Sequence, residues 1–318
     1  MEKEKLYEMI QNYLKDPPIV VWGSGATIAY GLPSMKELNS KIISEFDYFD
    51  SNSTNLEEEL GKEKYFSHID EIRDFIWKII YEKDKTIEKD IIDNSQKYEG
   101  ITKLVNFFLE PHPNILNIIT TNYDRVIENV LSINDIDFTD GFTGRAFSIF
   151  NDTLFNNKNK HVNLVKVHGS LNWFSINNDI RYYTELSYKP EIIPPGKNKY
   201  RQAFAEPYRN LIQISDELIK KSKSILVVGF GFNDEHITPL ITDKIRKGEP
   251  IVIITYELTN STKKQLLQAK NYIALERYGD DNKTKVSFKG KNDRTETTEI
   301  VNDNLWQLNN FMEVLYAE

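Results

Sequence analysis

The sequence predicts an α/β fold, a Rossmann-like doubly wound parallel sheet with an inserted helical module. Apolar runs of strand length recur along the chain, and helical segments separate several of them. The runs are almost continuously apolar, which is typical of parallel strands that helices cover on both faces. These runs lie at residues 19–22, 115–121, 162–167, 225–228 and 251–255.

Helices are predicted before, between and after these strands. Apolar residues at helical spacing mark residues 2–15, and Asp16-Pro17-Pro18 ends that helix, because proline lacks an N–H donor and restricts the residue before it. Residues 36–110 are helical in pattern throughout. Later helices are expected at 123–131, 208–221, 237–247 and in the tail from 261, whereas 137–160 and 176–205 read as loops or short strands near the ligand side.

These elements suggest a single domain over residues 1–318. Residues 17–35 and 111–260 would form the Rossmann-like core, residues 36–110 a helical insertion, and residues 261–318 a C-terminal extension that packs on the core.

The composition argues against nucleic acid and membranes as partners of the chain. With 40% hydrophobic and 28% charged residues the chain resembles a soluble globular protein, and its net charge of -8 provides no overall positive field for nucleic acid or an anionic membrane. The N-terminus has no signal-peptide core, and no run approaches the ~18 apolar residues of a membrane span. We therefore expect a cytoplasmic chain with no membrane contact and no sequence-specific binding to nucleic acid.

Metal binding is also not expected. The chain has no cysteine, which excludes disulfides and thiolate metal sites. The histidines other than His168 have no carboxylates near them at metal-ligand spacing.

Glycine-containing and polar segments follow four of the strands. In an open parallel sheet the ligand binds beyond the carboxyl ends of the strands, so these segments are candidates for a common site. They are "GSGAT" at 23–27, "TTNYD" at 120–124, "HGS" at 168–170 and "GFGFND" at 229–234.

Each segment taken alone has two interpretations. Gly23 and Gly25 suit a phosphate cradle or a plain tight turn, and the third glycine of the dinucleotide fingerprint is missing. Asn122 and Asp124 suit a site or a helix cap, and His168 suits a base or a structural histidine. Together, however, they suit cleavage of an N-glycosidic bond: His168 can accept a ribose hydroxyl proton, and Asn122 can orient the ribose or an attacking water.

Taken together, these motifs resemble the sirtuin-like family over roughly residues 17–260. "GSGAT…YGLP" resembles the family's "GAGxS…GIP" nucleotide loop, and "TTNYD" resembles its "TQNID". "KVHGS" is similar to the "HG" that bears the catalytic histidine, and "VVGFGFND" to the glycine-containing segment that closes over the NAD ribose. The resemblance implies that NAD is the ligand.

The resemblance also implies roles for individual residues. Asn122 would be the catalytic amide, His168 the base, and Asp124 the contact to the nicotinamide carboxamide. The residues implied to bind NAD are Gly23, Ser24, Gly25, Ala26 and Thr27 at the phosphates and ribose, Gly229, Phe230 and Gly231 at the adenosine side, and in addition Thr121, Tyr123 and Asp234.

Two departures separate the chain from the sirtuin deacylases. Those enzymes carry a four-cysteine zinc module, so no zinc is expected here, and their phenylalanine–arginine pair is replaced by Ser34-Met35, with Lys36 next. Both departures match a bacterial sirtuin-like branch used in antiphage defence, which hydrolyses NAD to ADP-ribose and nicotinamide. The resemblance thus implies an NAD glycohydrolase, with NAD+ as substrate, that stops an infected cell by depleting NAD.

Such an enzyme needs control, because unregulated NAD loss would kill its host. We expect a homo-oligomer or a regulatory partner, and the resemblance suggests a hexameric DNA-translocating ATPase or a short Argonaute. The segment 193–200, rich in proline and glycine, is expected to cover the pocket. Two alternatives stay open: an NAD-dependent protein deacylase, and a non-catalytic sensor that binds NAD or ADP-ribose.

Overall fold

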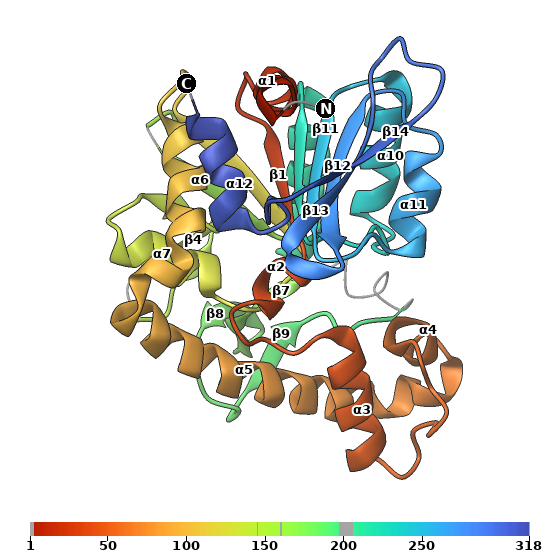
Figure 1. Ribbon diagram of the computed structural model, residues 1–318. Coiled ribbons are helices and arrows are strands. Elements are labelled where there is room, and N and C mark those ends of the chain that lie inside the picture. Colours follow the sequence, from red (N-terminus) through yellow and green to blue (C-terminus); the bar gives the residue numbers. More distant parts are fainter. Residues whose placement is uncertain (1–2, 145, 160, 197–205, 318) are drawn as a thin grey trace.

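The computed structural model describes residues 3–144, 146–159, 161–196 and 206–317. A nine-stranded sheet, as counted over these residues, has helices on both faces. A second layer of helices and short strands lies below the ends of its strands in Figure 1. This confirms the predicted α/β fold built on a large, mostly parallel sheet. Within the same residues, no helix has both the length and the apolar character needed to span a bilayer.

The large sheet has the strand order β14-β13-β12-β11-β10-β1-β2-β6-β3. All strands from β12 to β3 are parallel, while β13 and β14 are antiparallel additions at one edge. Since β1 lies between β2 and β10, the strand order reverses there, and a crevice opens beyond its carboxyl end. The strands are β1 (Ile19–Trp22), β2 (Ile115–Thr120), β3 (Phe138–Thr139), β6 (His161–Lys166), β10 (Ile225–Val228), β11 (Ile251–Thr255), β12 (Tyr272–Tyr278), β13 (Asp280–Lys289) and β14 (Thr297–Val301).

Helices cover the two faces of this sheet separately. One face carries α1 (Lys3–Tyr13), α6 (Glu99–Leu109), α7 (Val126–Ile133) and α12 (Leu308–Tyr316), and the other carries α9 (Tyr208–Lys221), α10 (Ile237–Lys247) and α11 (Asn260–Leu266). In β1, Val20 and Trp22 enter the first core, whereas Ile19 and Val21 enter the second. Because successive side chains point to opposite faces, a strand buried on both faces is apolar at most positions. This explains the continuous apolar runs.

The segment between β1 and β2 is helical. Its long helix α5 crosses beneath the sheet in Figure 1 and contacts α7. The capping box at Ser34 begins α3, because the Ser34 hydroxyl accepts from the Glu37 N–H (3.2 Å) and Glu37 accepts from the Ser34 N–H (2.7 Å). Besides α6, the segment contains α2 (Gly25–Ile28), α3 (Met35–Glu45), α4 (Leu56–Leu60), α5 (Ile69–Asp93) and the 3-10 turns Glu63–His68 and Ser95–Tyr98.

A second sheet, with five strands among the described residues, was not predicted as a sheet, although four of its strands lie in the segments 137–160 and 176–205 that were read as loops or short strands. Its order is β4-β5-β8-β7-β9, and all its pairs are antiparallel. Asn177 and Asn178, both at positive φ, form the two-residue turn between β7 and β8. The strands are β4 (Phe142–Thr143), β5 (Ile149–Phe150), β7 (Gly169–Ile176), β8 (Asp179–Tyr182) and β9 (Lys189–Ile192).

Two other differences concern the C-terminal tail and the start of one helix. The tail beyond residue 260 contributes three strands, β12 to β14, as well as the expected helices, so the large sheet continues past that residue. The helix expected at 123–131 begins only at Val126. Two carboxylates accept the backbone N–H groups at its start: Asp124 accepts from Val126 (3.3 Å), and Asp84 accepts from Arg125 (2.7 Å). Residues 121–125 are therefore an irregular loop that leads into the helix.

Candidate functional site

A cavity of about 570 Å³ lies at the carboxyl ends of the parallel strands, beside the switch point at β1. Its volume lies within the ~300–1,000 Å³ range of small-molecule sites. Leu38 of α3, Glu57 of α4 and Ile80 of α5 form part of the wall that faces the strand ends. The cavity thus lies between the sheet and the helical segment.

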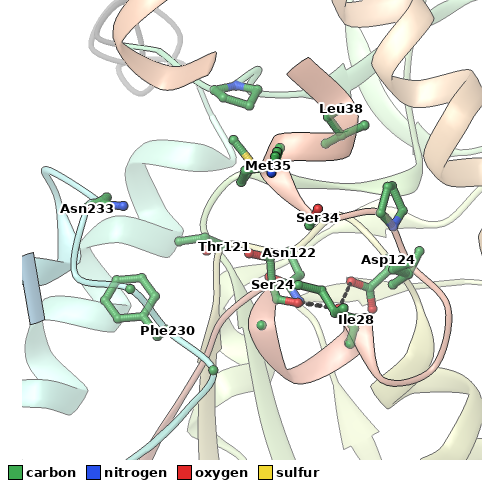
Figure 2. Close-up of a pocket in the computed structure, with 18 of the residues that line it drawn as sticks. Ser24, Ile28, Ser34, Met35, Leu38, Thr121, Asn122, Asp124, Phe230 and Asn233 are labelled. Carbon is green, nitrogen blue, oxygen red and sulfur yellow. Dashed lines mark hydrogen bonds between the residues drawn. The ribbon is translucent and has the colours of Figure 1, made fainter. Parts of the chain in front are cut away.

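Most of the residues selected from the sequence line this cavity. Gly23 and Ala26 do not line it. In Figure 2, Ser24, Asn122 and Asp124 lie close together on one side, and Phe230 and Asn233 lie on the other. The lining residues are Ser24, Gly25, Thr27, Thr121, Asn122, Tyr123, Asp124, His168, Gly229, Phe230, Gly231 and Asp234. Their individual roles toward a ligand remain predictions.

The glycines of the first loop let two loops approach each other closely. The Gly25 N–H donates to the Gly229 carbonyl oxygen (3.0 Å), and a Cβ at Gly23 would lie 2.5 Å from that same oxygen. Gly229 has a φ of +60°, and a Cβ there would lie 2.1 Å from the Ala26 nitrogen. These glycines therefore join the loops after β1 and β10. The helix that follows, α2, is a single turn, so it adds little dipole of its own.

Asn122 is fixed by hydrogen bonds to the first loop. Its side-chain Nδ2 donates to the Gly23 carbonyl oxygen (3.2 Å) and to Thr27 Oγ1 (3.3 Å), and its own N–H donates to Thr120 Oγ1 (3.0 Å). Because the Gly23 carbonyl can only accept, the amide nitrogen must point toward it. This orientation turns the side-chain oxygen of Asn122 away from the Gly23 carbonyl oxygen.

Asp124 is a buried carboxylic acid beside Asn122. Its Oδ2 accepts from Thr27 Oγ1 (3.4 Å). Burial raises the pKa of Asp124 from 3.8 to about 7, although the nearby Lys166 ammonium opposes the shift. A carboxyl group with this pKa exchanges protons near neutral pH, as residues of active sites often do.

Lys166, on β6, binds the backbone of Asp124. It has no exposed surface, and its ammonium donates to the backbone oxygen of Asp124 (2.5 Å) and to Glu128 of α7 (2.5 Å). The sequence analysis missed this residue. The signal was a lysine inside a strand predicted to be covered on both faces, which requires a buried partner.

His168 and Asp234 form a buried pair. His168 Nε2 lies 2.9 Å from Asp234 Oδ2, and the two residues are 3% and 4% exposed. The other oxygen of Asp234 accepts from the N–H groups of His236 (3.0 Å) and Ile237 (2.9 Å) at the start of α10. The carboxylate predicted to contact NAD thus faces the predicted base.

A family model, described as a SIR2-like domain, matches residues 116–275, which include Asn122, Asp124, His168 and Asp234. The chain belongs to the SIR2-like domain family. The sirtuin-like resemblance is confirmed at this level.

Solved structures with a related fold are distant from this SIR2-like chain in sequence. One, described as Sir2Tm bound to a propionylated peptide, is 14% identical; the match covers 82% of this chain and 89% of that one, with a TM-score of 0.45. Another, described as a complex of a Sir2 homologue with NAD, is 15% identical, with 86% and 88% covered and a TM-score of 0.46. The comparison with curated proteins gives no match.

The end of β11 adds lining residues that the sequence analysis of this SIR2-like chain missed. Tyr256 and Glu257 line the cavity, and Thr259 Oγ1 donates to the Gly231 carbonyl oxygen (2.7 Å). The same strand-end rule that selected the other loops would have selected this one, because the fifth apolar run was already identified. Ser34, Met35 and Lys36, the positions that depart from the deacylases, also line the cavity.

The predicted cover of the cavity is described only in part. Ile193 donates its N–H to the His168 carbonyl oxygen (2.9 Å), the Tyr123 hydroxyl donates to the Ile193 carbonyl oxygen, and Pro195 lines the cavity. Residues 197–200 of this segment lie outside the described residues. In the part of the chain that is described, no group of three or more His, Asp or Glu side chains is placed to hold a metal ion.

Proposed function

We propose that this SIR2-like chain is an NAD glycohydrolase, which converts NAD+ and water into ADP-ribose and nicotinamide. The observation that carries the proposal is the meeting of Asn122, Asp124 and His168 in one largely buried cavity at the sheet's switch point. An amide, a carboxyl group and an imidazole together suit cleavage of an N-glycosidic bond, because they can orient the ribose or a water and transfer a proton.

In the proposed reaction, the bond between C1′ of the ribose and the pyridinium nitrogen breaks. The electron pair of that bond goes to the nitrogen, and nicotinamide leaves as a neutral molecule. Water adds its oxygen to C1′, and its proton passes to His168 and then to solvent. The oxygen of Asn122 orients the water or the ribose, while Asp124 contacts the carboxamide and tolerates positive character on the ribose.

Hydrolysis is favoured over protein deacylation by the sequence. The chain contains no cysteine, so it cannot form the four-thiolate zinc module expected of the deacylases. Ser34-Met35 replaces the phenylalanine–arginine pair of the deacylases, and both residues face the cavity. NAD would then be the substrate, with no zinc.

In the cell, we propose a role as a toxic effector of bacterial antiphage defence in the cytoplasm. The wording "TTNYDRVIE" and "GFGFNDEHI" supports this assignment through its resemblance to that branch. Control would come from assembly into an oligomer or from a partner such as a hexameric ATPase or a short Argonaute. Expression during phage infection should lower cellular NAD, and the Asn122→Ala variant should leave NAD unchanged.

The test of the activity is nicotinamide release from NAD by the purified chain, alone, across protein concentrations and with candidate partners. Asn122→Ala and His168→Ala should each lower the rate at least ~100-fold, which is the typical loss when acid–base catalysis is removed. His112→Ala, an exposed histidine outside the cavity, is the matched control and should retain the full rate.

Three outcomes would contradict the proposal. NAD that stays intact under every condition but binds tightly would indicate a sensor. Release that depends on an acylated peptide would indicate a deacylase. Full activity in both Asn122→Ala and His168→Ala would mean that the cavity is not the site of hydrolysis.

A further inference from the structure

We propose that Asp234 is a positioning residue, which acts through His168 and does not bind the substrate itself. Its carboxylate would hold the His168 imidazole with the proton on Nε2, so that Nδ1 is the nitrogen that accepts a proton. The inference rests on the proposed function, because it assigns a partner to the base of that reaction.

The backbone places Asp234 at this position by strong local constraints. Phe232, two residues earlier, has a φ of +57°, which is unusual for a bulky side chain and is held by burial of its ring. Thr259 Oγ1 fixes the Gly231 carbonyl oxygen, and α10 begins at Ile237. The carboxylate is thus directed from a rigid loop, as a positioning group must be.

His168 is fixed in a similar way from the other side. The chain turns at Gly169, whose φ is +84° and where a Cβ would lie 2.0 Å from the Glu191 carbonyl oxygen. The His168 carbonyl oxygen accepts from the Ile193 N–H (2.9 Å). Both partners of the 2.9 Å contact between Nε2 and Oδ2 are therefore set by buried backbone.

The two oxygens of Asp234 have different partners. Oδ1 accepts two backbone N–H groups at the start of α10, and Oδ2 faces His168. Backbone donors to a carboxylate favour its ionised form. With 4% of the side chain exposed and both oxygens already in contact with protein groups, the carboxylate is held against His168, and the double-mutant cycle below distinguishes this role from direct contact with NAD.

The chemical consequence concerns the tautomer of His168. A neutral imidazole has one N–H donor and one acceptor nitrogen, and an ionised carboxylate can only accept. The contact with Oδ2 therefore selects the tautomer protonated on Nε2 and stabilises the imidazolium that forms when Nδ1 takes up a proton.

A double-mutant cycle of NAD hydrolysis tests the inference, with Asp234→Asn and His168→Ala alone and combined. Asparagine keeps an oxygen for the α10 N–H groups, and the melting temperature checks that the fold is retained. Asp234→Asn should lower kcat ~10-fold or more and change KM less than ~2-fold, because a wrong tautomer disables the base. Asp243→Asn, which changes an exposed carboxylate on α10, is the control and should change neither constant.

In the His168→Ala background, Asp234→Asn should have no further effect on the rate, since a residue that acts through His168 has nothing left to position. An additional loss there, or a raised KM with unchanged kcat, would show that Asp234 contacts the substrate and would overturn the inference.

Nitrogen-15 NMR of the histidine rings provides a second test that needs no turnover. The His168 signals, assigned by their loss in His168→Ala, should report the Nε2–H tautomer in the natural sequence and a changed tautomer in Asp234→Asn. An Nδ1–H tautomer, or identical signals in both proteins, would overturn the inference. Absence of NAD hydrolysis with the expected tautomer would instead refute the proposed function and leave the pairing intact.

Discussion

Asp84 of α5 has no exposed surface, and its carboxylate accepts three hydrogen bonds from Arg125, the residue after Asp124. The backbone N–H, Nε and Nη2 of Arg125 donate over 2.7, 2.8 and 2.6 Å. This pair connects the helical segment to the loop that carries Asn122 and Asp124. The position of that loop therefore depends on α5.

Replacing Asp84 with alanine should destabilise the protein by about 3–5 kcal/mol, because it removes the fully buried carboxylate that accepts three hydrogen bonds from Arg125. Urea-induced unfolding measures this loss. Glu88→Gln is the matched control on the same helix: Glu88 also contacts Arg125 (3.0 Å), but its side chain is 35% exposed, so the expected loss is at most about 1 kcal/mol. Equal losses in the two variants would show that the buried pair does not anchor the loop.

The close contact between the two glycine loops gives a second prediction. Gly229→Ala should cost about 1–2 kcal/mol for the left-handed backbone and a further ~1–3 kcal/mol for the collision with Ala26. Gly279→Ala is the control, because Gly279 has a similar φ of +65° but open space around its Cβ position. Thermal unfolding of both variants compares the two costs, and equal destabilisation would contradict the tight loop contact.

The raised pKa of Asp124 implies that the stability of the protein falls as the pH rises towards 7. Its pKa is raised in the folded protein from 3.8 to about 7, so between these values the folded state holds a proton that the unfolded state has released. The stability that this proton contributes is complete below about pH 4 and is lost as the pH rises through 7.

Asp124→Asn has no such proton, and asparagine retains an oxygen for the Val126 N–H. Its melting temperature should therefore rise relative to that of the natural sequence as the pH increases from 4 to 8. A difference that stays constant or shrinks over this range would mean that Asp124 is not protonated in the folded protein.

Much of the large sheet could be predicted from the sequence, because strands buried on both faces are apolar at most positions. The runs at 225–228 and 251–255 coincide with β10 and β11. The second sheet could not be predicted in the same way. Its strands are short and partly exposed, and the turn between β7 and β8 is Asn177-Asn178, a weaker hairpin signal than Asn-Gly.

The candidate site was predictable in its location, because strand ends at a switch point converge whatever the details of the loops. The contacts between individual side chains of the site could not be predicted. The contact of His168 with Asp234 joins two loops 66 positions apart in sequence, as their numbers show, and nothing in either motif fixes which atoms meet. The support of Asp124 by Lys166 likewise depends on a packing between β6 and α7 that has no local signature.

The central claim is NAD hydrolysis at this cavity, and the amounts of products test it most directly. The purified chain, assembled with whatever partner releases its activity, is given NAD without any acylated peptide, and nicotinamide and ADP-ribose are quantified together. The account predicts equal amounts of both products from the natural sequence and almost none from Asn122→Ala. Nicotinamide release only with an acylated peptide, or equal turnover by Asn122→Ala, would contradict it.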